Sequence, residues 1–405
     1  GSTLRVLHVN DYRSSGGCEV VVELTVSLLK SRGMDVDVFT SDDVPNYRRT
    51  PIGYISSNVC SNKLSEVLHR KRPDVVHLHN FYHELSPGIL KSLAQYRSKH
   101  DLLVVMTAHD YHLVCPNSGL VCFPRRNLQM ADVARLGSWS YLITQRWDER
   151  SIAHSLLKLA QHIFNYRLLR RHKVIDRILC PSKYIQSVLR TTGLETTHIP
   201  LPTPNAPGRS RRPESPLTMV FAGRVEPEKG LAQFLENLPG DLQGKLIVIG
   251  DGSQLQLCRD IGKQRQMQIV VDFVGKRPRD ETLSIISKSH LLVLPSLWVE
   301  NSPLSLLEAL AVGTNILVSD FGGMKEIVEC AGVGFTFTPG HPQSLVEALD
   351  RVVACFGQGT LNEFDVSRYL SEHNEQAYLD RLIRAYRRQW PASDDSMEGV
   401  GVTAV

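Results

Sequence analysis

The sequence predicts an α/β protein with two doubly wound domains that face a central cleft. Short apolar segments of strand length alternate with helical segments, which is typical of parallel sheets covered by helices. The alternation occurs twice along the chain. The two halves are separated by residues 200–216, which hold six prolines and almost no periodic signal, as expected of a linker. With 405 residues, 42% of them hydrophobic and 22% charged, the chain can bury two sizeable cores.

The first domain is predicted at residues 3–200 and opens with a strand at residues 5–9. The turn Ser15-Gly16-Gly17 then leads into a helix at residues 19–30, which Gly33 ends. Buried apolar segments continue the alternation. We expect further strands at residues 36–40, 74–79 and 102–108, and helices at 63–70 and 87–96.

The second domain is predicted at residues 217–374, after a linker at residues 201–216. Its first strand, at residues 217–222, ends in Gly223-Arg224, and a helix follows at residues 231–238. A last helical segment covers residues 375–390. Residues 391–405 are small, polar or acidic, which predicts a disordered tail. The other strands are expected at 246–249, 269–273, 291–294 and 314–318.

The most informative segment runs from Glu300 to Leu310. Pro303 disfavours helical geometry at Ser302 and itself suits the first helical position, so we expect a helix that begins here with Ser302 as its N-cap. Helical side chains lean toward the N-terminus, which brings Glu308 to the end that Glu300 approaches from the loop. Two carboxylates then flank free backbone N–H groups, where an anion would bind. This predicts a ligand that combines phosphate with sugar hydroxyls.

Arg224 and Lys229 supply positive charge after the first strand of the second domain. A lysine at a helix N-terminus is disfavoured by the helix dipole unless an anion also lies there. We therefore interpret the two cations as a clamp for a diphosphate. The alternative is that Glu226 and Glu228 pair with them on a solvated loop, because exposed ion pairs are common and weak.

Polar residues also follow the predicted strands of the first domain. Ligands of open parallel sheets gather at the carboxyl ends of strands, and these ends carry Asn10, Gly16-Gly17, His79-Asn80 and His109-Asp110. The two glycines either form a plain tight turn or let a phosphate or sugar approach the backbone closely. His8 and His77 lie within strands, where we expect buried histidines without a functional role. For His79 both interpretations stay open.

Four motifs in this order resemble the donor half of the family 4 retaining glycosyltransferases: Arg224-x4-Lys229, Gly250-Asp251-Gly252, Asp272-Phe273-Val274-Gly275 and Glu300-x7-Glu308. The resemblance extends from Arg5 to about Val352. It implies the GT-B fold, with two Rossmann-like domains, a donor-binding second domain, and the helix at 375–390 packed back on the acceptor-binding first domain. Gly322-Gly323 also matches the family, although Met324-Lys325 replaces its more usual apolar-proline step before Glu326.

The resemblance implies roles for individual residues. Glu308 would bind the ribose, Glu300 the transferred sugar, and Val274 with its backbone neighbours the base. The catalytic residues would be His109, Arg224, Lys229 and Glu300. The nucleotide-diphosphate-sugar donor would contact Gly17, Gly223, Arg224, Lys229, Gly252, Val274, Glu300, Ser302, Leu304 and Glu308. A glycan, lipid-linked or small-molecule acceptor would contact Asn10, His79, Asn80 and Asp110.

The implied reaction breaks the bond between the anomeric carbon and phosphate and retains the anomeric configuration. Arg224, Lys229 and the helix end would stabilise the departing diphosphate, which takes the acceptor proton itself. No Asp-x-Asp motif is placed to serve a donor, so we expect neither a metal nor another cofactor. The alternative is a catalytically silent nucleotide-sugar or glycan-binding protein on the same fold. The nucleobase, the sugar and the acceptor stay open.

Charge, cysteine content and hydropathy indicate which ligands and which cellular compartment to expect. A formal net charge of +4 is too small to indicate nucleic-acid binding. The eight cysteines show no paired framework, no signal peptide is recognisable, and no apolar run is as long as a membrane span. We therefore expect the protein to be located in the reducing cytoplasm. Cys115 and Cys122 form a close pair without further ligands at zinc spacing.

The segment at residues 114–178 departs from simple strand–helix alternation. It predicts a long helical region with aromatic residues and the basic residues Arg167, Arg170, Arg171 and Lys173. These cations suit peripheral contact with the anionic inner face of a membrane, or a polyprenyl-diphosphate acceptor. The alternative is a solvated basic face above a packed helix.

Overall fold

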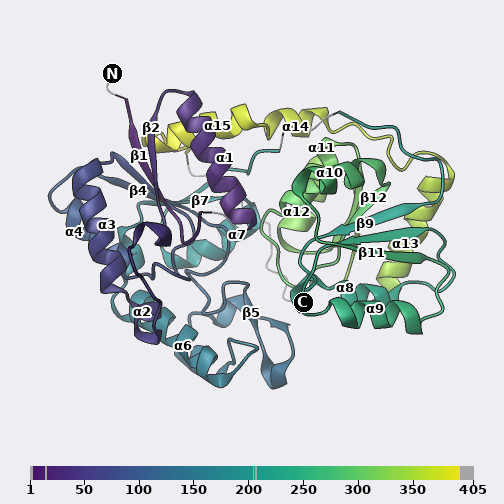
Figure 1. The fold of residues 1–405 in the computed structure, drawn as a ribbon, viewed down its shortest axis with the longest axis horizontal. Helices are drawn as coiled ribbons and strands as arrows, with labels where there is room; N and C mark the ends of the chain where they lie inside the picture. Colours follow the sequence, from purple (N-terminus) through teal and green to yellow (C-terminus); the bar gives the residue numbers. More distant parts are fainter. Residues whose placement is uncertain (1–2, 14–15, 204, 206–207, 393–405) are drawn as a thin grey trace.

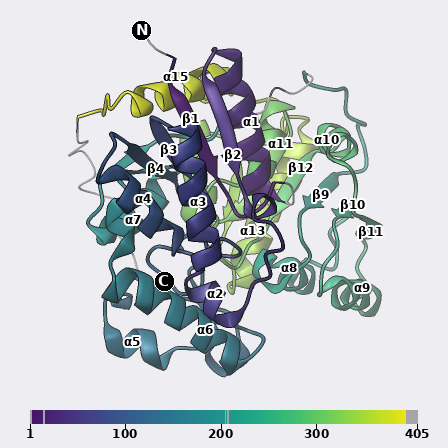
Figure 2. The same cartoon turned by 60° about the vertical axis from the view of Figure 1, so that its left-hand side comes forward.

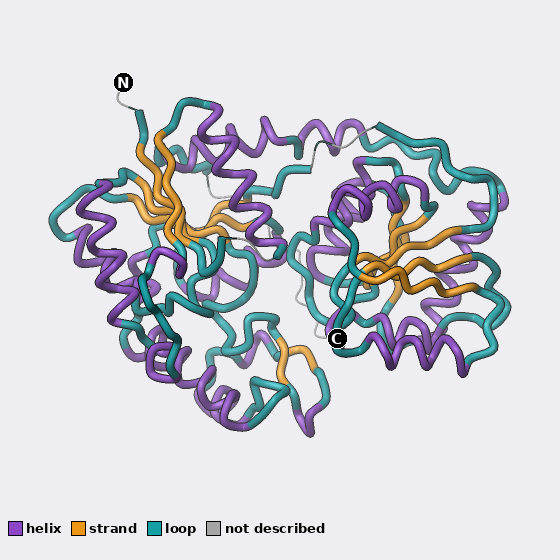
Figure 3. Tube along the Cα trace, viewed as in Figure 1, coloured by secondary structure: helices purple, strands orange, loops and turns teal. Residues whose placement is uncertain are grey.

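The computed structural model describes residues 3–13, 16–203, 205 and 208–392. It contains two six-stranded parallel sheets, each surrounded by helices, and this confirms the predicted class of two doubly wound α/β domains. Figures 1 and 3 show the two sheets side by side, with the first domain on the left and the second on the right.

The first sheet has the strand order β2-β1-β3-β4-β7-β8. The central strands β3 and β4 are buried along their whole length, which suits a sheet covered on both faces. The strands are β1 (Arg5–Val9), β2 (Asp35–Phe39), β3 (Val75–Leu78), β4 (Leu103–Thr107), β7 (Arg177–Cys180) and β8 (Thr196–His198). The helices around this sheet are α1 (Gly17–Ser31), α3 (Asn58–Lys71), α4 (Ile89–Arg97) and α7 (Lys183–Leu189).

The second sheet has the order β11-β10-β9-β12-β13-β14. β10 and β12 lie on opposite sides of β9, so the side on which successive strands are added to the sheet changes at β9. A ligand crevice is expected at the carboxyl end of such a strand. The strands are β9 (Thr218–Ala222), β10 (Lys245–Ile249), β11 (Val270–Gly275), β12 (Leu291–Leu294), β13 (Asn315–Ser319) and β14 (Phe335–Phe337). The helices are α8 (Leu231–Asn237), α9 (Leu255–Gln264), α10 (Arg279–Lys288), α11 (Leu304–Ala311), α12 (Gly322–Ala331) and α13 (Pro342–Gly357).

A helical layer extends the first domain below its sheet (Figure 2). Its elements are α2 (Pro51–Ile55), the short antiparallel pair β5 (Val121–Cys122) and β6 (Gln129–Met130), α5 (Trp139–Thr144) and α6 (Ile152–His162). A π-helical turn at Ile163–Leu168 continues α6. Trp147 is fully buried in this layer, and its indole N–H donates to the carbonyl of Leu142 at 2.8 Å.

The end of the described chain returns to the first domain. After α14 (Ser367–Glu372), α15 (Glu375–Tyr386) runs across the top of Figure 1 and lies beside α1. Tyr378 and Thr25 share a buried hydrogen bond of 2.8 Å, and Tyr386 bonds to His77 at 2.5 Å. The helix ends at Tyr386, four residues before the predicted end at 390. The predicted tail falls mostly on residues 393–405, which lie outside the described residues.

Candidate functional site

A cleft of about 570 Å³ lies between the two domains, at the carboxyl ends of β1, β4 and β12. Both domains contribute to its walls. The predicted site residues that line it are Gly17, Asn80, His109, Asp110, Arg224, Lys229, Glu300, Ser302 and Leu304. Asn10, His79, Gly223, Gly252, Val274 and Glu308 do not line it.

Glu300 and Lys229 are bonded to one another in the cleft. The Nζ of Lys229 lies 2.7 Å from Oε1 of Glu300, and both side chains are largely buried. The same oxygen accepts from Ser296 Oγ at 2.9 Å and from Trp298 Nε1 at 2.8 Å. Oε1 is therefore fully used, whereas Oε2 has no hydrogen-bond partner among the described residues. One oxygen holds the carboxylate in place and the other is available to a ligand hydroxyl.

Glu300 stays ionised despite its burial. Burial alone would raise the pKa of its carboxyl group, but the Lys229 ammonium and the three hydrogen bonds outweigh it and hold that pKa below the ordinary value. A buried carboxylate held in this way is a strong hydrogen-bond acceptor.

Trp298 is a cleft residue that the sequence analysis missed. Its ring lies 5.3 Å from the Lys229 ammonium and 5.8 Å from the Arg224 guanidinium, within the range of cation–π attraction. A Cβ at Gly119 would come within 2.7 Å of the ring, so a glycine is needed there. The signal in the sequence was its position two residues before Glu300 at the end of a strand. Trp298 thus connects both cations to the carboxylate.

Arg224 is the more accessible cation. It forms an ion pair with Glu228 at 3.3 Å, and 59% of its side chain is exposed. The pairing with Glu228 that was considered from the sequence is therefore present, although an exposed pair of this kind is weak and a phosphate can replace it. Glu226 instead accepts from Ser253.

The start of α11 differs from the prediction. Pro303 has φ −69° and ψ 122°, an extended conformation, so it precedes the helix, which begins at Leu304. Ser302 is not the N-cap, and no side chain caps the helix. The amide groups of Leu304 and Ser305 have no acceptor among the described residues, and both residues line the cleft. The correction leaves more free N–H groups for an anion than a serine cap would.

Glu308 lies about one turn further along α11 than Leu304. It pairs with Arg279 of α10 at 3.3 Å, and burial raises the pKa of its carboxyl group although Arg279 opposes this. Val274 is part of β11 and packs partly against the second-domain core, while its carbonyl accepts from Arg277. The predicted ribose and base contacts therefore lie beyond the walls of the cleft, along the same side of the second sheet.

Glycines fix the shape of the second-domain loops. A Cβ at Gly250 would lie 1.8 Å from the carbonyl oxygen of Gly223, and one at Gly252 would lie 2.3 Å from that of Val225. A Cβ at Gly323 would lie 1.4 Å from the carbonyl oxygen of Asn301. Gly250, Gly252 and Gly323 therefore shape the loops that carry the site, and only a glycine fits where these segments cross.

A row of hydrogen-bonded histidines leads into the cleft from the first sheet. His8 Nδ1 lies 2.9 Å from His79 Nε2, and His79 Nδ1 lies 2.9 Å from His109 Nε2. Burial lowers the pKa of His8 to about 3 and that of His109 to about 4. Burial also keeps the pKa of His77 and of His79 well below the ordinary value. All four rings are neutral at pH 7.

The row is better suited to hydrogen bonding than to a metal. Nitrogens of His8, His77 and His79 lie within 4.8 Å of one another. However, the rings of His77 and His79 are stacked at 4.3 Å and 15°, and a metal must lie in the plane of every imidazole that binds it. His77 also uses both ring nitrogens, with Tyr386 at 2.5 Å and Thr107 at 2.6 Å.

Asn10 and His79 are not at the surface of the cleft, contrary to the predicted acceptor contacts. Asn10 is fully buried and bonds to Tyr12, Glu19 and the amide of Asn80. His79 is 2% exposed, behind His109. Their positions at the carboxyl ends of strands place them next to the site, but the residues that reach the cleft are their neighbours Asn80 and His109.

Asp110 and Tyr82 form part of the first-domain wall of the cleft. The hydroxyl of Tyr82 donates to Asp110 Oδ2, and the amide of His112 donates to Oδ1 at 3.0 Å. Burial raises the pKa of Asp110 to about 6 in spite of these bonds. Tyr82 was not singled out in the sequence because it follows its strand at a greater distance.

Direct bonds hold the two domains together beside the cleft. Asn301 accepts from Ser182 at 2.8 Å and donates to the carbonyl of Ala108 at 2.9 Å. Glu326 of α12 accepts from the amides of Lys183 and Tyr184, at 2.7 and 3.1 Å, at the start of α7. A carboxylate of one domain therefore caps a helix of the other.

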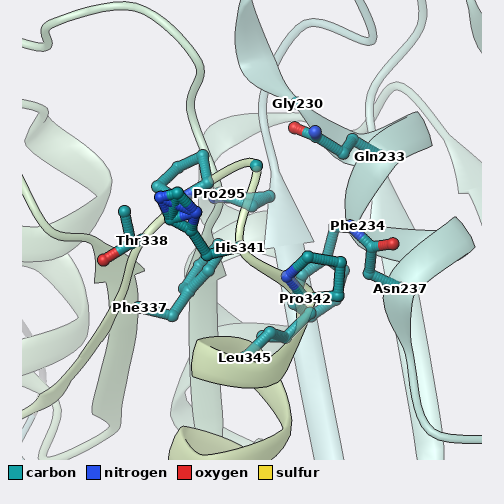
Figure 4. A pocket seen from close by; sticks show the side chains of 12 residues that line it. Gly230, Gln233, Phe234, Asn237, Pro295, Phe337, Thr338, His341, Pro342 and Leu345 are labelled. Carbon is teal, nitrogen blue, oxygen red and sulfur yellow. The ribbon is translucent and has the colours of Figure 1, made fainter. Parts of the chain in front are cut away.

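A second cavity, shown in Figure 4, lies under Gly230 and beside His341 and Pro342. Its volume is about 10 Å³, room for about one water molecule. It is too small for the ligand that the sequence predicts.

The predicted basic face is mostly occupied within the protein. Arg167 donates to the carbonyls of Leu136 and Gly137, Arg171 donates to Ser56 and Asn165, and Lys173 donates to Thr192. Exposed apolar side chains lie nearby instead, on α5, α6 and the π-helical turn. They are Trp139, Ile143, Ile152, Leu156, Phe164, Leu168 and Leu169. None of the described helices has the length and apolar character to cross a membrane.

Known proteins resemble this chain in sequence and fold. An uncharacterized glycosyltransferase, MJ1607 of Methanocaldococcus jannaschii, is 29% identical over 169 residues, which are 41% of this chain and 42% of that protein. The chain thus matches less than half the length of this relative. The sucrose-phosphate synthase of Thermosynechococcus elongatus has a TM-score of 0.69 at 16% identity, over 95% of this chain and 98% of that one. Anabaena HepE in complex with UDP-glucose has a TM-score of 0.62 at 15% identity, over 95% and 99%.

Two family descriptions match consecutive parts of the chain. Residues 15–201 match Glycosyltransferase Family 4, and residues 203–357 match Glycosyl transferases group 1. The boundary between the matches falls in the proline-rich linker, and together they include both walls of the cleft. The chain therefore belongs to the family 4 glycosyltransferases, whose second domain is of the glycosyl transferases group 1 type.

Proposed function

We propose that the protein is a retaining, metal-independent glycosyltransferase. It transfers a sugar from a nucleotide-diphosphate sugar to a hydroxyl group of a glycan, a lipid-linked carrier or a small molecule. The observation that carries the proposal is the Glu300 carboxylate, which is fixed through Oε1 and open at Oε2, beside two cations and an uncapped helix end. A sugar hydroxyl needs an acceptor such as this carboxylate, and a phosphate needs cations and free backbone N–H groups. The cleft offers both kinds of partner next to one another.

The donor binds with its diphosphate against Arg224, Lys229 and the amides of Leu304 and Ser305. The sugar then lies between Glu300 and His109, which face the cleft from opposite domains. A sugar hydroxyl that donates to the free Oε2 of Glu300 keeps the Lys229 contact to Oε1 intact. The ammonium of Lys229 has two further N–H donors for phosphate oxygens.

In the reaction the bond between the anomeric carbon and the phosphate oxygen breaks, and its electron pair stays on that oxygen. The acceptor oxygen forms a new bond to the anomeric carbon from the same face and passes its proton to the departing phosphate oxygen. Negative charge grows on the diphosphate, where fixed cations and helix amides stabilise it without rearranging. These groups make a metal unnecessary for that stabilisation, and retention follows from attack on the face of departure.

His109 positions the donor sugar in this proposal. It is neutral, and its Nδ1 has no hydrogen-bond partner among the described residues, so this nitrogen is available to a sugar hydroxyl. Asp110 lies beside it with Tyr82 and binds the acceptor hydroxyl. Neither residue has to form a covalent intermediate.

The experiment is a thermal-shift panel of UDP-, GDP-, TDP- and ADP-sugars, followed by a donor hydrolysis assay with the strongest binder. The structure of HepE with UDP-glucose makes UDP-glucose the first compound to test. A ligand specific to the folded state raises its stability by RT ln(1 + [L]/Kd), about 2.7 kcal/mol at one hundred times Kd. Binding with slow hydrolysis supports the enzyme. Binding without turnover by any acceptor or water would favour a silent binding protein, and no binding at all contradicts the site.

We also propose that the first domain contacts an anionic membrane at its periphery. Exposed apolar side chains at Ile152, Leu156 and Leu168 supply an inserting face, and the exposed Arg170 follows Leu168 by two residues, while Arg167, Arg171 and Lys173 mainly hold the helices together. Flotation with anionic vesicles at low salt tests this. Ile152→Ser with Leu156→Ser should abolish flotation, and the surface variant Lys99→Gln should not. Absence of wild-type binding removes the proposal.

A further inference from the structure

A further cavity, of about 440 Å³, adjoins the cleft within the first domain. The two share Tyr82, His83 and Ser118 as a common rim. Its wall holds the side chains of Arg49, Arg150, His154 and Lys158. No carboxylate is among the described residues that line it. A cavity of ligand size that is continuous with a transfer site, and is lined by cations, needs a ligand of matching charge.

Three of these residues come from one stretch of chain. Arg150 lies two residues before α6, and His154 and Lys158 follow at helical spacing on the face of α6 that lines the cavity. Arg49 contributes from the opposite side, just before α2, and donates to the carbonyl of His83 at 2.7 Å. Cations from two separate elements therefore face the same space.

Only part of this positive charge is neutralised within the protein. Asp148 pairs with both Arg150 and Lys158, each at 2.9 Å. Burial alone would raise the pKa of Asp148, but these two cations hold it well below the ordinary value. Arg49 pairs with Glu84 at 3.6 Å. Two carboxylates behind the wall thus face three cations in front of them.

The N-terminus of α6 adds to the excess of positive charge around the cavity. This helix has 11 residues and no acidic residue in its first turn, so the positive end of its dipole is not compensated there. Ser151 caps α6 by accepting from the amide of His154, and its hydroxyl also bonds to Nδ1 of His154 at 2.7 Å. Lys158 in the second turn has Asp148 as its partner. An anion in the cavity would share Lys158 and Arg150 with Asp148 and would also interact favourably with the start of α6.

We propose that this cavity binds a phosphate or diphosphate group of the acceptor. The inference rests on the proposed function, since it assigns the acceptor of that reaction to a chemical class, the phosphorylated or diphosphorylated hydroxyl compounds. The acceptor's hydroxyl then lies at the common rim, near Tyr82 and Asp110, and its anionic group lies between Arg49 and Arg150. The anion holds the acceptor, and the rim presents the hydroxyl to the donor sugar.

Two sources of such an anion are distinguishable by size and apolar character. A soluble sugar phosphate fills the cavity alone. A lipid-linked diphosphate also brings an apolar chain, which Tyr54 and Leu157 on the cavity wall can contact. The exposed Ile152 and Leu156 lie about 160° around α6 from His154 and Lys158, so they are outside the cavity. Both sources share the chemistry that Arg49, Arg150 and Lys158 recognise.

The experiment measures calorimetric binding of three probes to the full chain: inorganic phosphate, glucose 6-phosphate and farnesyl diphosphate. Arg150→Gln and Arg49→Gln remove one cation each from the cavity, and Arg49→Gln leaves both partners of Asp148 in place, so it guards against misfolding of the first variant. Arg224→Gln removes a cation of the donor site. Lys99→Gln is the matched surface control, because Lys99 is exposed and lies outside both cavities.

We expect Arg150→Gln and Arg49→Gln each to weaken binding of the best probe by about tenfold, as loss of one charge-assisted contact does, while Arg224→Gln and Lys99→Gln leave it unchanged. Tightest binding by farnesyl diphosphate identifies a lipid-linked source, and tightest binding by glucose 6-phosphate a soluble one. Weakening by Arg224→Gln alone overturns the inference and leaves the donor site intact. Equal binding by all variants also overturns it. Failure of every nucleotide sugar to bind, with cavity-dependent phosphate binding retained, would instead remove the proposed transfer reaction.

Discussion

At the scale of single residues, the divided use of the Glu300 carboxylate is the central feature of the site. Three donors converge on Oε1, and two of them, Lys229 and Trp298, also line the cleft. The pair of Lys229 and Glu300 therefore serves stability and binding. A buried ion pair is costly to break from one side, because the remaining charge has no solvent to stabilise it.

A double-mutant cycle tests this coupling. Lys229→Met and Glu300→Gln should each lower the free energy of unfolding by about 3 kcal/mol or somewhat less, and the double variant should lose less than the sum. Urea denaturation followed by circular dichroism measures the three values. Arg224→Gln is the control, since its exposed pair with Glu228 should change stability by less than about 1 kcal/mol. Strict additivity would show that the pair is not coupled.

The histidine row predicts acid sensitivity of known sign. The pKa of His8 is lowered to about 3 and that of His109 to about 4, against about 6.5 in the unfolded chain. Between these values only the unfolded state binds the protons, so stability falls as the pH drops from about 6.5 toward 4. Each linked histidine contributes a slope of up to about 1.4 kcal/mol per pH unit.

His8→Asn should reduce that slope by about one proton, because the shorter amide can keep the bond to His79 while the unpartnered Nε2 of His8 is lost. Denaturant midpoints at pH 5, 6 and 7 measure the slope. His100→Asn, at an exposed histidine, should leave it unchanged. An unaltered slope in His8→Asn would mean that His8 does not titrate with folding.

The charged residues of the cleft were easier to predict from the sequence than their partners. Arg224, Lys229 and Glu300 could be selected because a motif places them at strand and helix ends. The bond between Lys229 and Glu300 and the ring of Trp298 depend on how loops from different strands meet, which no local pattern encodes. Asn10 and His79 were selected by position, but burial directs their side chains to structural partners.

At the scale of elements, the central apolar strands were predictable, whereas the shorter strands β7, β8 and β14 were not predicted and helix ends were less accurate. Continuous apolar runs such as residues 291–294 coincide with β12, because a strand buried on both faces is mostly apolar. The predicted start of α11 was wrong by one residue, because the backbone of Pro303 is extended and Pro303 therefore precedes the helix.

The uncapped start of α11 predicts an exchange between stability and binding. Pro303→Asp places a cap and a negative charge where an anion would otherwise bind, so it should raise the free energy of unfolding by about 1 kcal/mol and weaken nucleotide-sugar binding several-fold. Thermal denaturation and calorimetric titration measure the two effects. Pro303→Ser caps without charge, so it separates the two causes. Tighter donor binding in Pro303→Asp would exclude an anion at this helix end.

At the scale of the whole molecule, the bonds across the domain boundary set the width of the cleft. The two-domain architecture was predictable from repeated alternation and the proline-rich linker. The contacts between the domains were not, because Asn301 and Glu326 give no sign in the sequence that their partners lie in the first domain.

Glu326→Ala should open the cleft. It leaves the amides of Lys183 and Tyr184 without their acceptor, at a cost of about 1–3 kcal/mol in the closed arrangement only. Small-angle scattering should show a larger radius of gyration, and KM for the donor should rise more than kcat falls. Glu329→Ala, at an exposed position of the same helix, is the control. An unchanged radius would show that the bond does not restrain the domains.

The return of α15 has a consequence for biosynthesis. Val6, Leu29 and Val36 of the first domain share a core with Tyr378, Leu382 and Tyr386 of that helix. The ribosome completes the first domain early, yet this apolar surface stays uncovered until translation has passed the entire second domain, on the order of ten seconds or more at about 5–20 residues per second. Interrupted translation should therefore release an aggregation-prone fragment. A chaperone that covers the apolar surface until α15 is made should raise the yield of native protein.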